Sequence, residues 1–367
     1  MVYATVQRNV MRWPLKVINS NGKPKVEVNW CGKAKQSTAE EISAMVLLEM
    51  KKTAEVYLSE EVTNPIITLP ACFNGSQRKA TIDAGKIAGL NVMLIISELM
   101  AAALAYGLGK RIDSQRNVFI FDLGGGTFDV SVISIGNEKF EVKAVGGDTH
   151  LGGGDFDSRL VDYCVETFKQ KQGGIDLTTN AKAISRLRRV CENAKRTLSL
   201  LERTSIDVDS LHEDIDFSVS ISRHKFEQIC SDLFDRMLAI VEKALRDAKL
   251  DKADVHETLL VGGSTRVLKM QRLLQGVFSR SKFIKSINLD EAAAYGAVLL
   301  ASDMTSKQSL NILEVAPISL HLATPGGVAT TLIERSMINP SKKAVIPITY
   351  FGYQEDICYG CMEEGMR

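Results

Sequence analysis

An excess of charge of one sign is missing from this sequence of 367 residues. Its 45 Lys and Arg residues almost balance its 44 Asp and Glu residues, which leaves a formal net charge of +1. Attraction to nucleic acid or to an anionic membrane needs a positive surface, so neither is expected as the main partner. The composition, with 45% hydrophobic and 24% charged residues, is that of a globular protein of about two domains. Disordered, collagen-like and fibrous proteins are excluded.

Long apolar runs are also missing. No stretch approaches the roughly 20 consecutive apolar residues that a membrane-spanning helix needs. Arg8, Arg12 and Lys16 interrupt the start of the chain, so neither a signal peptide nor a membrane anchor is expected there. The seven cysteines are odd in number and scattered, which does not fit a disulfide framework and favours a reducing compartment. The expected location is therefore the cytosol or the nucleus.

Metal and nucleophile patterns are lacking too. The spacing of Cys358 and Cys361 invites a zinc or redox interpretation, but no second Cys/His pair lies close in sequence. Two incidental thiols are therefore the favoured interpretation. The histidines show no metal-ligand spacing and no pairing with a nucleophile, which leaves a Ser/His/Asp hydrolase unsupported. They are His150, His212, His224, His256 and His321.

The hydrophobic periodicity predicts an α/β protein, because helical and extended segments alternate along most of the chain. Helices are predicted at 39–58, 76–88, 100–108, 181–203, 222–249, 267–277 and 291–302, and strands at 66–69, 92–96, 118–121, 128–135 and 258–261. Two of the helices are rich in small residues and follow an acid, Glu98 or Asp290, which an internal duplication would explain. After about Thr305 the apolar residues alternate around Pro325-Gly-Gly327, which predicts a second, all-β unit.

The segment Asp122-Leu-Gly-Gly-Gly-Thr-Phe-Asp129 is the strongest chemical signal. It places two carboxylates on opposite strands beside a turn whose backbone N–H groups no Cβ obstructs. Such amides can surround a phosphate, and the carboxylates can hold the water shell of Mg²⁺. The alternative is a plain glycine hairpin with solvated aspartates.

Three weaker signals accompany this turn. Gly262-Gly-Ser-Thr-Arg266 lies between a strand and a helix, where it is either a second phosphate cradle or a flexible helix entry. The Gly146–Asp155 segment is a further Gly/Asp cluster that a surface loop would also explain. On the 181–203 helix, Glu192, Lys195 and Ser199 share one face, which composition alone assigns to solvent.

Taken together, these segments resemble the 70-kilodalton heat-shock chaperones, members of the actin and sugar-kinase ATPase superfamily. The motifs that carry the resemblance stand in the family's order and cover nearly the whole chain. They are Pro70-Ala-Cys-Phe-Asn74, Asp122–Asp129, Gly147-Asp-Thr-His-Leu-Gly-Gly153, Cys191-Glu-Asn-Ala-Lys-Arg-Thr-Leu-Ser199, Glu242-Lys-Ala-Leu-Arg-Asp-Ala-Lys249 and Leu260-Val-Gly-Gly-Ser-Thr-Arg266. The resemblance implies an actin-like, two-lobed ATPase domain at 1–304, a linker at 305–315 and a partial β-sandwich for peptides at 316–367.

The resemblance also implies roles for individual residues toward ATP or ADP and Mg²⁺. Glu98, Asp122, Thr127 and Asp129 match the catalytic residues, and Asp122 and Asp129 match those that hold Mg²⁺ through water. The nucleotide is implied to bind at Gly124, Gly125, Gly126, Thr127, Gly153, Glu192, Lys195, Arg196, Ser199, Gly262, Gly263, Ser264, Arg266 and Asp290.

The sequence departs from the family at several points. The family opens with a Gly-Thr-Thr phosphate loop and a lysine that faces the γ-phosphate, and this sequence begins downstream of both. Leu99-Met100 replaces Pro-Thr after Glu98, Leu289 replaces a proline, and Gly154 replaces an acid. The β-rich end stops before any lid helices. The resemblance therefore implies a relative shortened at both ends, with reduced ATP hydrolysis and reduced client binding.

The expected function is ATP-dependent assistance of protein folding under stress. The expected partners are unfolded or extended apolar peptides, J-domain co-chaperones and nucleotide-exchange factors. One alternative is a non-catalytic interaction protein that sequesters co-chaperones, and ATP turnover distinguishes the two. A sugar kinase of the same superfamily is a remote alternative, because it would need a hexose pocket and a base for the sugar hydroxyl.

Overall fold

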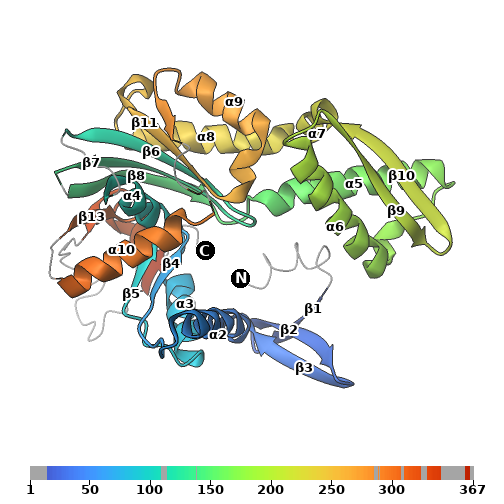
Figure 1. Cartoon of the computed structure of the whole chain (residues 1–367), viewed down its shortest axis with the longest axis horizontal. Coiled ribbons are helices and arrows are strands. Elements are labelled where there is room, and N and C mark those ends of the chain that lie inside the picture. The colour runs from blue at the N-terminus through green and yellow to red at the C-terminus, as the bar shows by residue number, and fades with distance from the viewer. Residues whose placement is uncertain are drawn as a thin grey trace, which may run out of the picture. The chain divides into compact units, whose positions relative to one another are not determined.

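A computed structural model of the chain (Figure 1) describes residues 15–108, 114–137, 139–284, 288, 290–306, 310–323, 329–339 and 360–363. Its packing divides the chain into two units. The first unit comprises residues 1–67, 75–95 and 154–231, and the second unit comprises residues 68–74, 96–153 and 232–367. Both units combine helices with strands, which confirms the predicted α/β class.

The first unit begins with an antiparallel meander of β1 (Lys16–Ser20), β2 (Lys23–Trp30) and β3 (Lys33–Thr38). Helix α2 (Ala39–Leu58) has the predicted bounds. It begins where Thr38 and Glu41 form a capping box that satisfies its first amides, and it ends where Ser59 takes a left-handed conformation. It packs against α3 (Gly75–Ile87) through a small core built around Ala44, Ala84 and Leu90. Strands β4 (Ile66–Leu69) and β5 (Leu94–Ser97) lie close to their predicted positions.

The remainder of the first unit corrects two predicted helices. Helix α6 (Ala181–Leu198) stops five residues before the predicted position 203, because the Arg223 guanidinium binds the carbonyl oxygens of Leu198 and Leu201. Strands β9 (Arg203–His212) and β10 (Ile215–Ser222) follow as an antiparallel hairpin that the sequence did not predict. The predicted long helix at 222–249 is broken at Cys230, whose ψ of 10° interrupts the helical geometry between α7 (Arg223–Ile229) and α8 (Ser231–Asp247).

The second unit is built on a seven-stranded mixed sheet in the order β12-β11-β6-β7-β8-β13-β16. Its centre is the antiparallel set β6, β7 and β8, flanked by β11 parallel to β6 and by β13 parallel to β8. The strands are β6 (Arg116–Leu123), β7 (Phe128–Gly136), β8 (Lys139–Asp148), β11 (Glu257–Val261), β12 (Lys282–Ile284), β13 (Asn311–Val315) and β16 (Ile338–Asn339). Almost every side chain of β6 and β7 is buried, so these strands form the core that positions the turn between them.

Helices α4 (Glu98–Leu108) and α10 (Ala292–Ser306) are the two small-residue helices predicted as duplicated elements, and they pack against each other (Figure 1). The approach is closest at Gly296, where an added Cβ would overlap the carbonyl group of Ala101. Small side chains are needed because they allow two helix backbones to approach this closely. Helix α9 (Leu268–Val277) follows β11, and α5 (Gly153–Lys171) follows β8.

The end of the chain forms a small antiparallel sheet in the order β15-β14-β17. Strands β14 (Leu320–Ala323) and β15 (Ala329–Ile333) lie in the segment predicted to be β-rich, and β17 is Gly360–Glu363. The turn at Pro325–Gly327 and Cys358 lie outside the described residues. The domain boundaries at 304, 315 and 316 stay predictions.

In the described part of the chain, no helix combines the length and the apolar character that crossing a membrane requires.

Candidate functional site

Three acidic side chains of the second unit interact electrostatically. Asp122 is the penultimate residue of β6 and Asp129 is the second residue of β7, and the antiparallel register places the two residues directly opposite each other. Glu98 is the first residue of α4. Asp122 is 8% exposed and Asp129 is 3% exposed, so this acidic group, defined as Glu98, Asp122 and Asp129, is largely withdrawn from water.

Burial sets the protonation of the acidic group. It raises the pKa of Glu98 to about 7, and repulsion from Asp122 and Asp129 adds to the shift. Burial likewise raises the pKa of Asp122 to about 7, with a further contribution from Asp129. The pKa of Asp129 rises only to about 6, because hydrogen bonds from Cys72 and Ala71 stabilise its charged form.

Only one of the two carboxylate oxygens of Asp129 is hydrogen-bonded to a described protein group. Its Oδ2 accepts a hydrogen bond of 3.2 Å from the Ala71 amide, whereas its buried Oδ1 has no hydrogen-bond partner among the described residues. A buried carboxylate oxygen without a donor is costly, and a cation or a proton would satisfy it. The acidic group therefore offers carboxylate oxygens, the type of ligand that hydrated Mg²⁺ prefers.

The glycine turn between β6 and β7 is open. The Gly124 amide donates a hydrogen bond of 3.1 Å to the Thr127 carbonyl oxygen, which closes the turn. Gly125 and Gly126 are exposed, and a Cβ added at either would meet no atom within 4 Å. The Gly153 amide donates a hydrogen bond of 2.9 Å to the Gly124 carbonyl oxygen. The predicted third Gly/Asp cluster, to which Gly153 belongs, therefore contacts the glycine turn.

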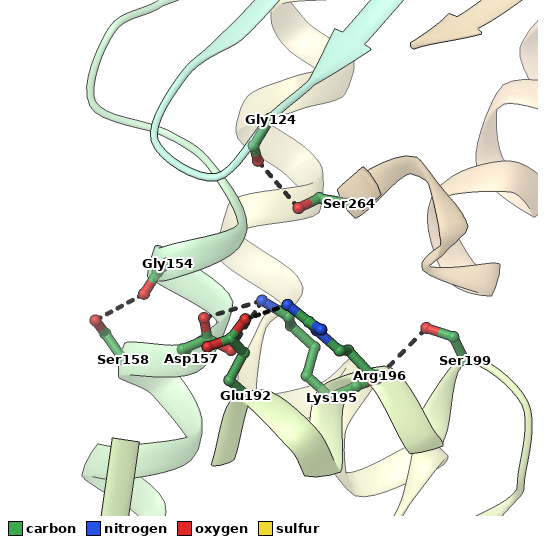
Figure 2. Close-up of polar contacts among 9 residues, drawn as sticks. All are labelled: Gly124, Gly154, Asp157, Ser158, Glu192, Lys195, Arg196, Ser199 and Ser264. Carbon is green, nitrogen blue, oxygen red and sulfur yellow. Dashed lines mark hydrogen bonds and ion pairs between the residues drawn. The ribbon is translucent and has the colours of Figure 1, made fainter. Parts of the chain in front are cut away.

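The second glycine turn lies beside the first on the neighbouring strand of the same sheet. Because β11 pairs with β6, Val261 lies opposite Asp122, and Gly262 follows directly. The Ser264 hydroxyl donates to the Gly124 carbonyl oxygen at 3.0 Å (Figure 2). The Arg266 guanidinium forms an ion pair of 2.8 Å with Asp290, with both side chains about half exposed. These residues belong to the second unit together with the acidic group.

Replacing Gly262 by alanine is expected to destabilise the protein by about 2 kcal/mol or more, the upper range for overpacking and backbone strain. Gly262 has φ +82°, and an added Cβ would collide with the Leu123 carbonyl oxygen and lie 2.8 Å from Asp122 Oδ1. Urea unfolding measures the change. Gly276→Ala is the matched control, because its Cβ meets nothing within 4 Å and alanine favours helix α9. Equal stability of the two variants would contradict the close packing of the two turns.

The four predicted residues of α6 lie at its C-terminal end in the first unit. Lys195 is not solvated, since its side chain is 11% exposed and forms an ion pair of 2.8 Å with Asp157 of α5. Arg196 is exposed and pairs with Glu192 at 2.5 Å, as expected for an i,i+4 spacing (Figure 2). The Ser199 hydroxyl donates to the Lys195 carbonyl oxygen at 3.4 Å. The assignment of this whole face to solvent is therefore wrong for Lys195.

Sequence reasoning missed two contacts in these regions. Asp157 was not a candidate, because the Lys195 ion pair joins two helices and leaves no mark in local spacing. Burial raises the pKa of Asp157 although Lys195 acts in the opposite direction. Cys72 was noted only as part of a motif, and its hydrogen bond to the Asp129 carboxylate depends on chain segments far apart in sequence.

A mixed sheet with two adjacent glycine turns and buried acids is the arrangement of an actin-like ATPase. A family model described as "Hsp70 protein" matches residues 2–361. The chain is 54% identical over 360 residues to "Heat shock 70 kDa protein" of Emericella nidulans, covering 96% of this chain and 56% of that protein. It is 52% identical over 358 residues to the Neurospora crassa protein of the same name, covering 96% and 55%.

A third relative is "Heat shock cognate 70 kDa protein 3" of Dictyostelium discoideum, 50% identical over 349 residues and covering 93% of this chain and 55% of that protein. The chain belongs to the 70-kilodalton heat-shock family, a family of nucleotide-binding ATPases. Its mixed α/β fold is consistent with the actin-like ATPase domain of that family. The chain spans about half the length of these relatives.

Proposed function

We propose that the chain binds ATP and ADP with Mg²⁺ as part of a protein-folding chaperone. The observation that carries this proposal is the open Gly124–Gly126 turn directly between Asp122 and Asp129. Phosphate oxygens would accept hydrogen bonds from the exposed backbone amides of the turn. The hydrogen bond from the Ser264 hydroxyl to the Gly124 carbonyl oxygen fixes the second turn beside the first.

The negative charge of the acidic group would attract the metal ion, and one of its carboxyl groups would orient the attacking water. Asp122 and Asp129 would hold hydrated Mg²⁺, which neutralises charge on the phosphates when it is bound. Glu98 lies close enough for its carboxyl group to interact electrostatically with both aspartates, and we assign it the orientation of the attacking water. Catalysis in such sites comes mainly from positioning and charge stabilisation. The reduced hydrolysis expected from the resemblance stays a prediction for the 367-residue chain.

We assign adenosine binding to the end of α6. Glu192 and Arg196 are exposed there, and Lys195 is held in place by Asp157. A guanidinium group can stack on an adenine ring, and carboxylate and ammonium groups can hydrogen-bond to a ribose. Arg266, Asp290, Gly262 and Gly263 of the second unit complete the nucleotide-binding set that the resemblance implies.

Replacing Arg196 by alanine is expected to weaken ADP binding about 5-fold, because the stacking of an exposed guanidinium group is worth about 1 kcal/mol. The variant should fold normally, since its surface pair with Glu192 contributes little to stability. Calorimetry with ADP and Mg²⁺ measures the affinity. Lys182→Ala is the matched control, because Lys182 is an exposed residue of the same helix. Equal affinity of the two variants would contradict the adenosine assignment.

Calorimetry also tests nucleotide binding itself. We expect measurable binding of ADP by the unaltered chain, and no heat at millimolar ADP would contradict the proposal. Lys195→Ala is a less direct probe, because it leaves the buried Asp157 carboxylate without its cation and lowers stability as well.

The wider chaperone activity is proposed from the family. We propose that unfolded or extended apolar peptides are the clients, with J-domain proteins and nucleotide-exchange factors as partners in the cytosol or nucleus. The support in this chain is the small antiparallel sheet β15-β14-β17, which lies in the 316–367 segment that the resemblance assigns to peptide binding. Binding of a fluorescent apolar peptide that changes with added ATP would test this. Peptide binding without ATP turnover would favour the non-catalytic alternative.

A further inference from the structure

Helix α2 has two apolar sides. One side, with Ala44 and Leu47, packs against α3 in the small core of the first unit (Figure 1). The opposite side carries six apolar side chains that follow the helical repeat and are all exposed, with Val56 82% exposed and Tyr57 88% exposed. This α2 stripe consists of Ile42, Met45, Val46, Met50, Val56 and Tyr57. An exposed apolar surface of this extent on a folded unit is typical of an interaction site.

The charged residues that border the α2 stripe lie on one of its sides. Glu49 and Lys52 are near its middle, on the same side as Met45, because positions three, four and seven apart share one face of a helix. Their side chains form an ion pair of 3.7 Å within the helix, and both are more than half exposed. The other side of the stripe is bordered by Ser43 and Ala54, which carry no charge.

We propose that the α2 stripe is a dimer interface, at which a second copy of this chain packs its own α2 in the antiparallel direction. A two-fold axis perpendicular to the helices brings the same side of both stripes together. Each Glu49 then meets Lys52 of the partner subunit. In a parallel pair, the charged side of one helix would meet the uncharged side of the other. Charge complementarity therefore selects the antiparallel pair.

The size of the stripe sets the expected strength of the dimer. Six side chains exposed to this extent present on the order of 600 Å² of apolar surface per copy. A symmetric pair buries about twice that area, at the lower end of the range of about 1,200–2,000 Å² for specific interfaces. We therefore expect a Kd of about 10 µM. The dimer does not rest on the proposed function, because the acidic group and both glycine turns belong to the second unit.

Sedimentation velocity of the full chain measures the dimer directly. Over roughly 1–300 µM protein we expect a monomer–dimer equilibrium and no larger species. Val46→Glu should weaken the dimer at least 10-fold, because the two-fold symmetry places two carboxylates in the apolar contact. Val298→Glu is the matched control and should leave the Kd unchanged, since Val298 is an exposed valine of α10 in the second unit. Circular dichroism verifies that each variant is folded.

Charge reversal tests the direction of packing. Glu49→Lys and Lys52→Glu each place like charges against each other across the interface, so each variant alone should weaken the dimer at least 5-fold. An equimolar mixture of the two variants should form a dimer at least as strong as that of the unaltered chain, because every pair across the interface is then attractive. The like charges within each helix remain in the mixture, so only contact between two copies explains the recovery.

Three results would overturn the proposal. A chain that stays monomeric over the whole concentration range has no such interface. Assembly beyond a dimer, or association that Val46→Glu leaves unchanged, would place the contact on another surface or with another geometry. Equal association of the single charge variants and of their mixture would show that two α2 helices do not pack in the antiparallel direction.

Discussion

Replacing Asp122 by asparagine is expected to lower ATP hydrolysis at least 100-fold and at the same time to stabilise the protein at pH 8. The loss of activity would follow from removing a charge at the proposed Mg²⁺ site, where one electrostatic interaction is worth about 2.7–4 kcal/mol. The gain in stability follows because asparagine fits the same space without a buried charge. Steady-state phosphate release and urea unfolding measure the two quantities.

The gain in stability should depend on pH in a defined direction. Burial raises the pKa of Asp122 from 3.8 to about 7, so between these values the folded state binds a proton that the unfolded state has released. The free energy of unfolding of the unaltered protein therefore falls as pH rises through this window and levels off above pH 7. The advantage of Asp122→Asn should be about 1–3 kcal/mol larger at pH 8 than at pH 4.5, allowing for coupling to Glu98 and Asp129.

A matched control separates this effect from a general change in charge. Asp214 is exposed in the β9–β10 turn, so Asp214→Asn removes the same charge without altering the acidic group. It should change neither hydrolysis nor the pH dependence of unfolding. A destabilised Asp122→Asn protein at pH 8 would show that the carboxylate is stabilised by its surroundings, against the raised pKa.

Replacing Gly296 by valine is expected to cost about 3 kcal/mol or more, which is enough to unfold a large fraction of a marginally stable protein. An added Cβ at Gly296 would overlap the carbonyl group of Ala101. The atoms it would meet belong to the backbone of α4, so no side-chain rotation can relieve the collision. Thermal unfolding and the yield of soluble protein measure the effect.

Gly276→Val provides the control for this substitution. Gly276 is also in a helix, but its Cβ would have nothing within 4 Å. The valine there should leave the melting temperature nearly unchanged, whereas at position 296 it should lower it by many degrees. Similar melting temperatures for the two variants would show that α4 and α10 can separate without cost.

The sequence by itself determined the local parts of this protein. The position of α2 follows from the apolar residues that recur along it, and the β6–β7 hairpin follows from two apolar runs around the glycine turn. The alanine-rich segments of α4 and α10 were identified as related, and they pack together. Such features depend on neighbouring residues, whose spacing the chain carries directly. The candidate residues of both glycine turns were identified from the same local patterns.

Only the tertiary structure decided the features that depend on distant partners. Helix α6 ends where Arg223 reaches its last carbonyl oxygens, and the break at Cys230 divides an otherwise continuous apolar pattern. The pKa values of the acidic group are raised by burial, which no local spacing reports. Cys72 and Asp129 stand 57 positions apart in the sequence, yet their hydrogen bond joins the loop after β4 to β7. Local patterns identified the two glycine turns and the flanking aspartates, and packing between distant segments determined the raised pKa values of the acidic group.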